Sequence, residues 1–176
     1  MENKSKDHFE RYKAIRNKID KHVSALEKTH RKHLACKKGC DLCCMDYSIF
    51  PVEFYSIQHE LKNREIPVQT NQEADEKSCV FLVDHSCAVY AERPVICRTH
   101  GLPLIFANDD GEFELSACEL NFTNFDFEEF NMDNTFHQDK YNSMLFMLNR
   151  EFVASLPENQ FSEFDLIPIK KLAEAF

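Results

Sequence analysis

The sequence predicts a mainly helical α+β fold, in which small β-hairpins and irregular loops form a cysteine-rich core between a long N-terminal helix and a C-terminal helix. Three observations predict it. Amphipathic segments lie towards both ends of the chain, short apolar runs broken by turn residues lie between them, and 8 cysteines occur in 176 residues. This length fits a single domain over residues 1–176, and no internal repeat divides it.

The N-terminal part, residues 1–35, is predicted to be dominated by one long helix over residues 7–35. Apolar residues recur there at every third or fourth position, with charged residues between them. The inward stripe consists of Phe9, Tyr12, Ile15, Ile19, Val23, Leu26, His30 and Leu34. We expect the helix to end at Cys36 and Gly39 to reverse the chain.

The central part, residues 36–122, is expected to contain a second helix and a surface loop. Pro51 suits the first turn of that helix, because its missing N–H has no helical partner there. The inward residues of the helix are Phe54, Ile57 and Leu61. Residues 65–78 are polar and lack periodicity, which indicates a surface loop.

Turn residues divide the rest of the central part. Asp84 to Ser86 separate two short apolar runs and predict an irregular hairpin, and Pro94 predicts the start of a short helix. Asp110-Gly111 predicts the turn of a second hairpin. Phe113 and Leu115 are expected on one face of it.

The C-terminal part, residues 123–176, is predicted to contain one substantial helix. Its inward residues are Tyr141, Leu145, Leu148 and Phe152. Pro157 is expected to close this helix, and residues 167–176 are expected to add a last short one.

Charge and composition exclude several kinds of protein. The formal net charge of −9 argues against nucleic acid and anionic membranes as partners, because both require clustered Lys and Arg. Only 3 glycines are present, which leaves almost no place for a glycine-rich phosphate-binding loop. No apolar run approaches the length of a membrane span or a signal sequence, so we expect a cytoplasmic protein. The reducing cytoplasm disfavours disulfides, and metal binding becomes the preferred interpretation of the cysteines.

Thiolates are soft ligands that select zinc, copper(I) and iron–sulfur clusters. A structural zinc and a cubane cluster each take four ligands, so the chain has enough thiols for two four-thiolate sites, or for one site and several packing residues. Neighbouring side chains of extended backbone point apart, so Cys44 is expected to serve a second site or to pack. The predicted metal ligands are Cys36, Cys40, Cys43, Cys44, Cys79, Cys87, Cys97 and Cys118.

Three stretches of the sequence resemble the bacterial YkgJ-like cysteine-cluster family, which is named for its CxxCxxCC motif and described as zinc- or iron-chelating. They are "CKKGCDLCC", "CVFLVDHSCAVYAERPVICRTHGLPL" and "ACELNF". The matching positions are Cys79, Phe81, Leu82, Cys87, Tyr90, Arg93, Pro94, Cys97, Arg98, Cys118, Asn121 and Phe122. The first pair, Cys36 and Cys40, departs from the motif by one additional residue. The resemblance implies metal chelation; a similar motif in flagellin lysine methylases leaves protein methylation as an alternative.

Further candidate residues surround the cysteines. Arg98 and His100 are expected to contribute to cofactor binding, Arg98 by donating hydrogen bonds to sulfur and His100 as a replacement ligand. Residues 122–136 are rich in Phe and are expected either to pack or to bind a protein partner.

The predicted function is therefore a metal-binding protein whose cysteines hold iron, as an iron–sulfur cluster such as [4Fe–4S], or zinc. The alternatives are a structural-zinc module for protein interaction and a redox or protein-modifying enzyme, although no catalytic signature or catalytic residue is identifiable in the sequence.

Overall fold

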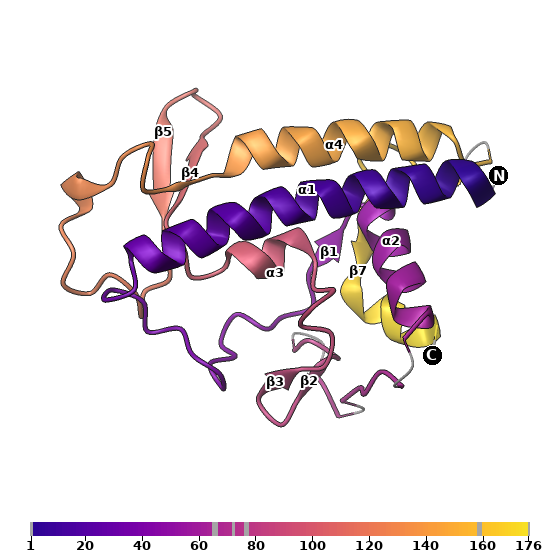
Figure 1. Cartoon of the computed structure of the whole chain (residues 1–176), viewed down its shortest axis with the longest axis horizontal. Helices are drawn as coiled ribbons and strands as arrows, with labels where there is room; N and C mark the ends of the chain where they lie inside the picture. Colours follow the sequence, from indigo (N-terminus) through magenta and orange to yellow (C-terminus); the bar gives the residue numbers. More distant parts are fainter. Residues whose placement is uncertain (1, 65–66, 72, 76–77, 158–159, 176) are drawn as a thin grey trace.

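The computed structural model describes residues 2–64, 67–71, 73–75, 78–157 and 160–175. Two long helices, α1 (Glu2–Thr29) and α4 (Gln138–Ala154), lie side by side, and the shorter α2 (Pro51–Lys62) and α3 (Val95–Thr99) pack against α1 (Figure 1). The β2–β3 hairpin lies on the side of α1 away from α4 (Figure 1). This helical framework with small strand pairs confirms the predicted fold class.

Within the described residues, the strands are short and form three small sheets. β1 (Ser48–Ile49) pairs with β7 (Ile167–Pro168), and β2 (Leu82–Val83) pairs with β3 (Ser86–Cys87), both antiparallel. The third sheet has β4 (Leu104–Ala107) in the centre, antiparallel to β5 (Phe113–Ser116) and parallel to β6 (Phe136–His137). Two 3-10 helices, η1 (Phe127–Glu129) and η2 (Ile169–Ala175), complete the described elements.

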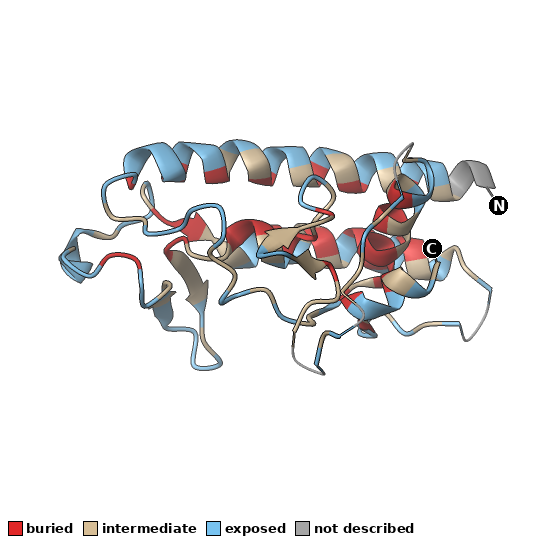
Figure 2. Cartoon of the chain, turned by 90° about the horizontal axis from the view of Figure 1, so that it is seen from below, coloured by how far each residue is buried: buried red, intermediate tan, exposed pale blue. Residues whose placement is uncertain are grey.

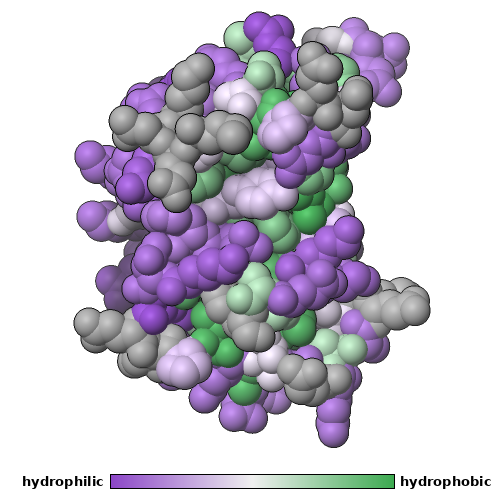
Figure 3. Space-filling model, turned by 90° about the vertical axis from the view of Figure 1, so that its right-hand side faces the viewer, coloured by the Kyte–Doolittle hydropathy of each residue, from purple (hydrophilic) through white to green (hydrophobic). Residues whose placement is uncertain are grey.

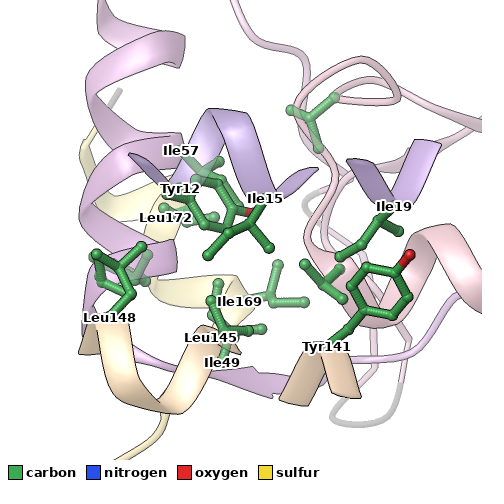
Figure 4. Close-up of a cluster of buried hydrophobic side chains, with 14 of the residues drawn as sticks. Tyr12, Ile15, Ile19, Ile49, Ile57, Tyr141, Leu145, Leu148, Ile169 and Leu172 are labelled. Atoms are coloured by element: carbon green, nitrogen blue, oxygen red, sulfur yellow. The ribbon is translucent and has the colours of Figure 1, made fainter. Parts of the chain in front are cut away.

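The hydrophobic core lies where α1, α2 and α4 meet the C-terminal segment (Figure 4). Tyr12, Ile57 and Leu172 are fully buried there, and Leu145 and Leu148 of α4 are also buried. Figure 2 shows the buried residues as stripes along the facing sides of the helices, with exposed residues on their outer sides. The apolar stripes predicted for these helices therefore form the core.

The first helix is shorter at its C-terminal end than the sequence predicts, because α1 ends at Thr29 and not at residue 35. The next residues form a turn, in which the His33 N–H donates to the His30 carbonyl at 2.7 Å. The buried His30 ring is held by the Asn134 carbonyl, 2.6 Å from Nε2. The apolar repeat of the sequence continues through His30, which is buried beyond the end of the helix. The same repeat would arise from a helix or from a turn that keeps this side chain buried, so it does not locate the helix end.

The other predicted elements agree with the structure at the described residues. Helix α2 begins at Pro51 and α3 begins just after Pro94. Both predicted hairpins form, with Asp84 and His85 at positive φ in the first turn and Gly111 at positive φ in the second. The last predicted helix is the 3-10 helix η2. Of the predicted loop 65–78, residues 65–66, 72 and 76–77 lie outside the described residues.

The Phe-rich segment mostly packs against the end of α1. Phe122 and Phe136 are buried, and Phe125 and Phe130 are half-buried. The rings of Phe122, Phe125 and Phe130 all lie within 5.8 Å of the His30 ring, measured between ring centroids. Only Phe127 of these phenylalanines is largely exposed, at 58%. Packing therefore accounts for most of this segment, and a protein partner there stays a prediction.

A groove lies between α2 and the C-terminal segment, at the end of the molecule where the termini lie. Its lining includes Phe54, Tyr55, Phe161, Ile167 and Lys171. Figure 3 shows this end of the molecule, where hydrophilic side chains surround smaller hydrophobic areas. Among the residues that the structure describes, no cysteine lines the groove, so it is separate from the candidate metal centre. In the described part of the chain, none of the helices combines the length and the apolar character of a membrane span.

Candidate metal centre

All eight cysteines are free thiols, each exposed or half-buried. They lie on segments with little regular structure: the loop after α1, the stretch leading into and through the β2–β3 hairpin, the short helix α3 and the turn after β5. Loops of this kind let side chains from distant parts of the chain approach one another.

Asn121 links the start of the cysteine loop, residues 36–44, to Cys118. Its Nδ2 donates to the Cys36 sulfur at 3.3 Å and to the Gly101 carbonyl at 2.6 Å, while its Oδ1 accepts from the Ala35 N–H at 2.7 Å. Its own N–H donates to the Cys118 carbonyl at 2.9 Å. Asn121 is only 4% exposed, so these bonds are shielded from water. The sequence identifies Asn121 only as a position of the family motif and does not predict that it bonds these segments together.

Gly101 allows this close approach. Its φ is +90°, and a Cβ built on it would lie 2.7 Å from the Cys36 sulfur. A glycine at this point therefore both adopts the left-handed backbone and leaves room for the sulfur. The sequence offers no signal for this contact, since the two residues are far apart along the chain.

A second link joins Cys44 to the β2–β3 hairpin. The Cys79 N–H donates to the Cys44 carbonyl at 3.1 Å, next to a β-bridge between Met45 and Ser78. The Cys79 carbonyl in turn accepts a hydrogen bond from the Leu82 N–H at 3.0 Å, and Leu82 pairs with Cys87 in the hairpin. The backbone therefore places Cys44, Cys79 and Cys87 in one neighbourhood.

The electrostatic interactions of Cys36 identify its neighbours. Burial raises the pKa of the Cys36 thiol, and the hydrogen bond from Asn121 opposes this rise. The nearby thiols of Cys40, Cys118 and Cys43 raise the pKa further. These three cysteines are therefore close enough to Cys36 to interact with it electrostatically.

Cys97 has a different set of neighbours. Burial raises the pKa of the Cys97 thiol, and the proximity of Cys79 and Cys87 raises it further. Burial is also the main cause of the raised pKa values of Cys79 and Cys87. The Cys44 thiol interacts with both of them. Thiols in such surroundings stay protonated near neutral pH unless a metal displaces the proton.

Cys43 and Cys44 touch, although their side chains were expected to point apart. A hydrogen bond from Cys44 lowers the pKa of Cys43 to about 6, and the same contact raises the pKa of Cys44. The expectation is wrong because the backbone is a turn here and not extended, with the Cys44 N–H donating to the Asp41 carbonyl at 2.8 Å.

The sulfur ligands fit a soft metal, but the thiols do not yet surround a common point at metal-binding distance. Across the part of the chain that the structure describes, no three His, Cys, Asp or Glu side chains are arranged tightly enough to hold an ion. The His100 Nε2 is buried and has no hydrogen-bond partner in the described structure. A metal or a polar ligand would satisfy this nitrogen, which is evidence for a bound group that does not depend on the cysteines. Burial lowers the pKa of His100, which favours the neutral ring that can bind a metal.

Tyr47 packs beside His100 and faces several thiols. The two rings lie 5.0 Å apart between centroids. Burial raises the pKa of Tyr47, and the nearby thiols of Cys43 and Cys97 raise it further. Its hydroxyl donates to the Cys43 carbonyl at 3.2 Å. Tyr47 therefore lies close both to Cys43 in the loop after α1 and to Cys97 of α3, a position that no sequence pattern predicts.

Arg98 is bound to protein oxygens. Its Nη1 donates to Asp20 of α1 at 2.7 Å, its Nε to the Arg93 carbonyl at 2.8 Å and its Nη2 to the Ala91 carbonyl at 2.6 Å. The bond to Asp20 fixes α3, and hence Cys97, to α1, while the two carbonyl bonds hold the segment that precedes α3. Donation to sulfur by Arg98 stays a prediction.

Arg93 provides positive charge near the thiols. It lies over the Tyr90 ring, 3.7 Å from the ring centroid, and donates to the Tyr90 carbonyl. Its charge acts to lower the pKa of Cys87 and of Cys97, against the larger effect of burial. Arg93 therefore favours the thiolate form that a metal requires.

The buried Glu53 of α2 holds the start of α3. It is 2% exposed, and its Oε1 accepts from the Tyr12 hydroxyl at 2.8 Å and from the Val95 N–H at 2.6 Å. Burial raises the pKa of Glu53 above its usual 4.5, despite these two bonds.

We expect Glu53→Gln to flatten the dependence of stability on pH. Because the folded protein holds the Glu53 proton more tightly than the unfolded chain does, the contribution of Glu53 to stability is fully present below pH 4.5 and is lost as the pH rises through the raised pKa. The amide oxygen of Gln can accept the same two hydrogen bonds without ionising. Urea unfolding from pH 4 to pH 8 measures the effect, and parallel curves for the two proteins would contradict it.

Comparison with known protein families gave a match to the central part of the chain. A family model described as "CxxCxxCC: Putative zinc- or iron-chelating domain" matches residues 35–119. The match includes all eight cysteines and the Asp41–His85 pair, whose side chains lie 2.6 Å apart between the cysteine loop and the hairpin. No curated protein and no solved structure matched the chain.

Proposed function

We propose that the protein binds iron, as an iron–sulfur cluster, or zinc through its cysteine thiolates, because residues 35–119 match a family model of zinc- or iron-chelating domains. The observation that carries the proposal is that hydrogen bonds and packing bring free thiols from four separate segments near one another, with Tyr47 close to Cys43, Cys44, Cys79 and Cys97. Soft thiolates select these metals over magnesium or calcium. The cytoplasm proposed from the sequence would keep the thiols reduced.

Metal binding completes the centre by drawing the loops together. The segments that carry the cysteines have few regular backbone hydrogen bonds. Small movements of these loops therefore cost little free energy compared with the free energy gained from the metal–sulfur bonds. Each thiol with a raised pKa loses its proton when it becomes a ligand. His100 is proposed as an additional nitrogen donor, since its Nε2 has no protein partner in the described structure.

The cysteine substitutions Cys40→Ser and Cys97→Ser test the proposal. Each is expected to lower the bound metal by at least half and to lower the melting temperature, because the binding free energy contributes to folding. Elemental analysis of anaerobically purified protein measures the metal. Ser116→Ala, an exposed position near Cys118, is the control and should keep the wild-type content. Unchanged metal in both cysteine variants would remove Cys40 and Cys97 from the ligand set.

The metal itself is identified by the same purification. Brown protein that releases acid-labile sulfide contains an iron–sulfur cluster, whereas colourless protein with zinc contains a zinc–thiolate site. Wild-type protein that is folded and holds neither metal would refute the proposed function.

A protein-interaction module is a second candidate function, because apolar side chains are exposed next to the cysteines. Leu42 is 73% exposed, Met45 is 46% exposed and Ile96 is 36% exposed. Such residues favour a partner surface supported by a structural metal. Complete four-sulfur coordination supports this candidate, whereas a water ligand on the metal supports the enzyme alternative.

A further inference from the structure

We propose that the contact between α1 and the start of α4 is a pH-sensitive latch, which is closed while the His22 ring is neutral and loosens when the ring takes up a proton. The latch consists of His22 of α1, Phe136 and His137 of β6, and Tyr141 of α4. None of these residues lies within two positions of a cysteine, so the inference does not rest on the proposed metal chelation.

His22 lies between elements that are far apart in sequence. Its Nδ1 is 3.2 Å from the Tyr141 hydroxyl, across 119 positions. Its ring is stacked on the Phe136 ring, with 5.3 Å between centroids, and Phe136 is in turn stacked on Tyr141 at 4.8 Å. In Figure 4, Tyr141 faces the part of α1 that carries Ile19, about one turn before His22. One polar contact and two ring contacts therefore join α1 to both β6 and α4.

The polar contact between His22 and Tyr141 depends on the protonation of the ring. When the ring is neutral with its hydrogen on Nε2, Nδ1 accepts a hydrogen bond from the Tyr141 O–H. When the ring is protonated, both nitrogens carry a hydrogen, and the hydroxyl can no longer donate to Nδ1. It must then accept from Nδ1 and direct its own hydrogen elsewhere.

The groups that face His22 oppose a positive charge on its ring. The His137 ring lies 6.1 Å away between centroids, and the Lys140 ammonium lies 5.6 Å from the Tyr141 centroid. Helix α4 begins at Gln138, so the positive end of its dipole also lies at this contact. Burial lowers the pKa of His22, and the charges of His137 and Lys140 lower it further.

The carboxylates nearest to these residues in the sequence are bonded elsewhere. Asp20, two positions before His22 on α1, accepts from Arg98 of α3 at 2.7 Å. Asp139, in the first turn of α4, accepts from the Ala107 N–H of β4 at 2.7 Å. The elements packed against this part of α1 therefore present His22 with two basic side chains and with acids that already have partners.

Loosening the latch is expected to release β6. This strand has two residues and pairs with Leu104 and Ile105 of β4. Pairing over so few residues is only marginally stable in water, so it depends on the packing of the buried Phe136 between His22 and Tyr141. A proton on His22 should therefore open the edge between β4 and β6 before the rest of the fold.

The expected pH dependence is opposite in sign to that of Glu53. Because folding lowers the pKa of His22 below its ordinary 6.5, the contribution of His22 to stability is fully present above pH 6.5. It is lost as the pH falls through the lowered pKa. The contribution of Glu53 is instead lost as the pH rises, so the two effects are separable in one protein.

Hydrogen exchange with mass spectrometry tests the latch in the full chain. After correction for the intrinsic effect of pH, the amides of residues 104–107 and 136–141 should exchange several-fold faster at pH 5.5 than at pH 7.5. In His22→Asn the side-chain oxygen can still accept from Tyr141 but cannot be protonated in this range, so the acceleration should vanish. The wild-type acceleration persisting in His22→Asn would overturn the proposal.

His59→Asn is the matched control. His59 is an exposed histidine of α2 that also lies beside a phenylalanine ring, that of Phe9, at 5.5 Å between centroids. This variant should keep the wild-type response, including any effect of acid on the cysteine thiols. Loss of the response in His59→Asn as well as in His22→Asn would contradict a latch at His22.

An NMR titration of the wild-type protein avoids variants that fail to fold. The His22 ring signals, assigned through their contacts with the rings of Phe136 and Tyr141, should titrate with a pKa below 6.5, and the backbone signals of β6 should change with them. A His22 pKa at or above 6.5, or β6 signals that do not follow the His22 ring, would overturn the inference.

Discussion

Gly101→Ala is expected to destabilise the protein and to reduce its bound metal. Gly101 has φ +90°, where an alanine costs about 1–2 kcal/mol on conformational grounds alone. The added Cβ would also lie 2.7 Å from the Cys36 sulfur and 3.1 Å from Asn121 Nδ2. Either the sulfur or the amide must move, which disturbs the link between Cys36 and Cys118. Denaturant unfolding and elemental analysis measure the two effects.

Gly111→Ala is the matched control for this substitution. Gly111 also has a positive φ, +79°, but a Cβ there would meet nothing within 4 Å. The control should therefore show the conformational cost without a loss of metal. Equal losses of stability and unchanged metal in both variants would show that the contact between Gly101 and Cys36 has no consequence.

Arg98→Met is expected to cause a large loss of stability. The Arg98 side chain is only 4% exposed, and the substitution leaves the Ala91 and Arg93 carbonyls without their donor. Removing one partner of such a buried, charged network typically costs about 3–5 kcal/mol, and we expect about 2–4 kcal/mol because the Asp20 side chain is 41% exposed. Urea unfolding of the metal-loaded protein measures the change.

Asp20→Asn distinguishes the contribution of the Arg98–Asp20 ion pair from that of the bonds between Arg98 and the backbone carbonyls. It removes only the negative charge opposite Arg98, at a partly exposed position, so its effect should be well below that of Arg98→Met. If Arg98 serves only to fix α3, the folded Arg98→Met protein should keep the metal spectrum of the wild type. An altered spectrum with unchanged stability would instead support the role near sulfur that the sequence predicts.

The fold class was predictable because its largest elements carry strong periodicity. The stripes from Tyr12 to Leu26 and from Tyr141 to Phe152 are buried as predicted, and Pro51 and Pro94 mark the helix starts. The pairings of β1 with β7 and of β4 with β6 were not predictable, since β1, β6 and β7 are only two residues long and have no period to detect.

For the candidate site, the sequence proposes the metal donors, which stay a prediction, but it gives no indication of the residues around them. Thiol chemistry and spacing identify the cysteines, because a reducing compartment disfavours disulfides and soft metals bind clustered thiolates strongly. The contacts of Asn121, Gly101 and Tyr47 depend on how the loops close, and each joins residues distant in sequence. Local sequence patterns carry no information about contacts of that range.

The pairing of β1 with β7 constrains the order of events during synthesis. The Lys170 N–H donates to the Asp46 side chain at 2.9 Å across 124 positions, and the Ile169 N–H donates to the Tyr47 carbonyl at 2.8 Å. Tyr47 therefore gains its final support only after residues 167–170 have left the ribosome. A nascent chain would expose the cysteines before that support exists, so metal loading is expected to be completed after translation of this segment.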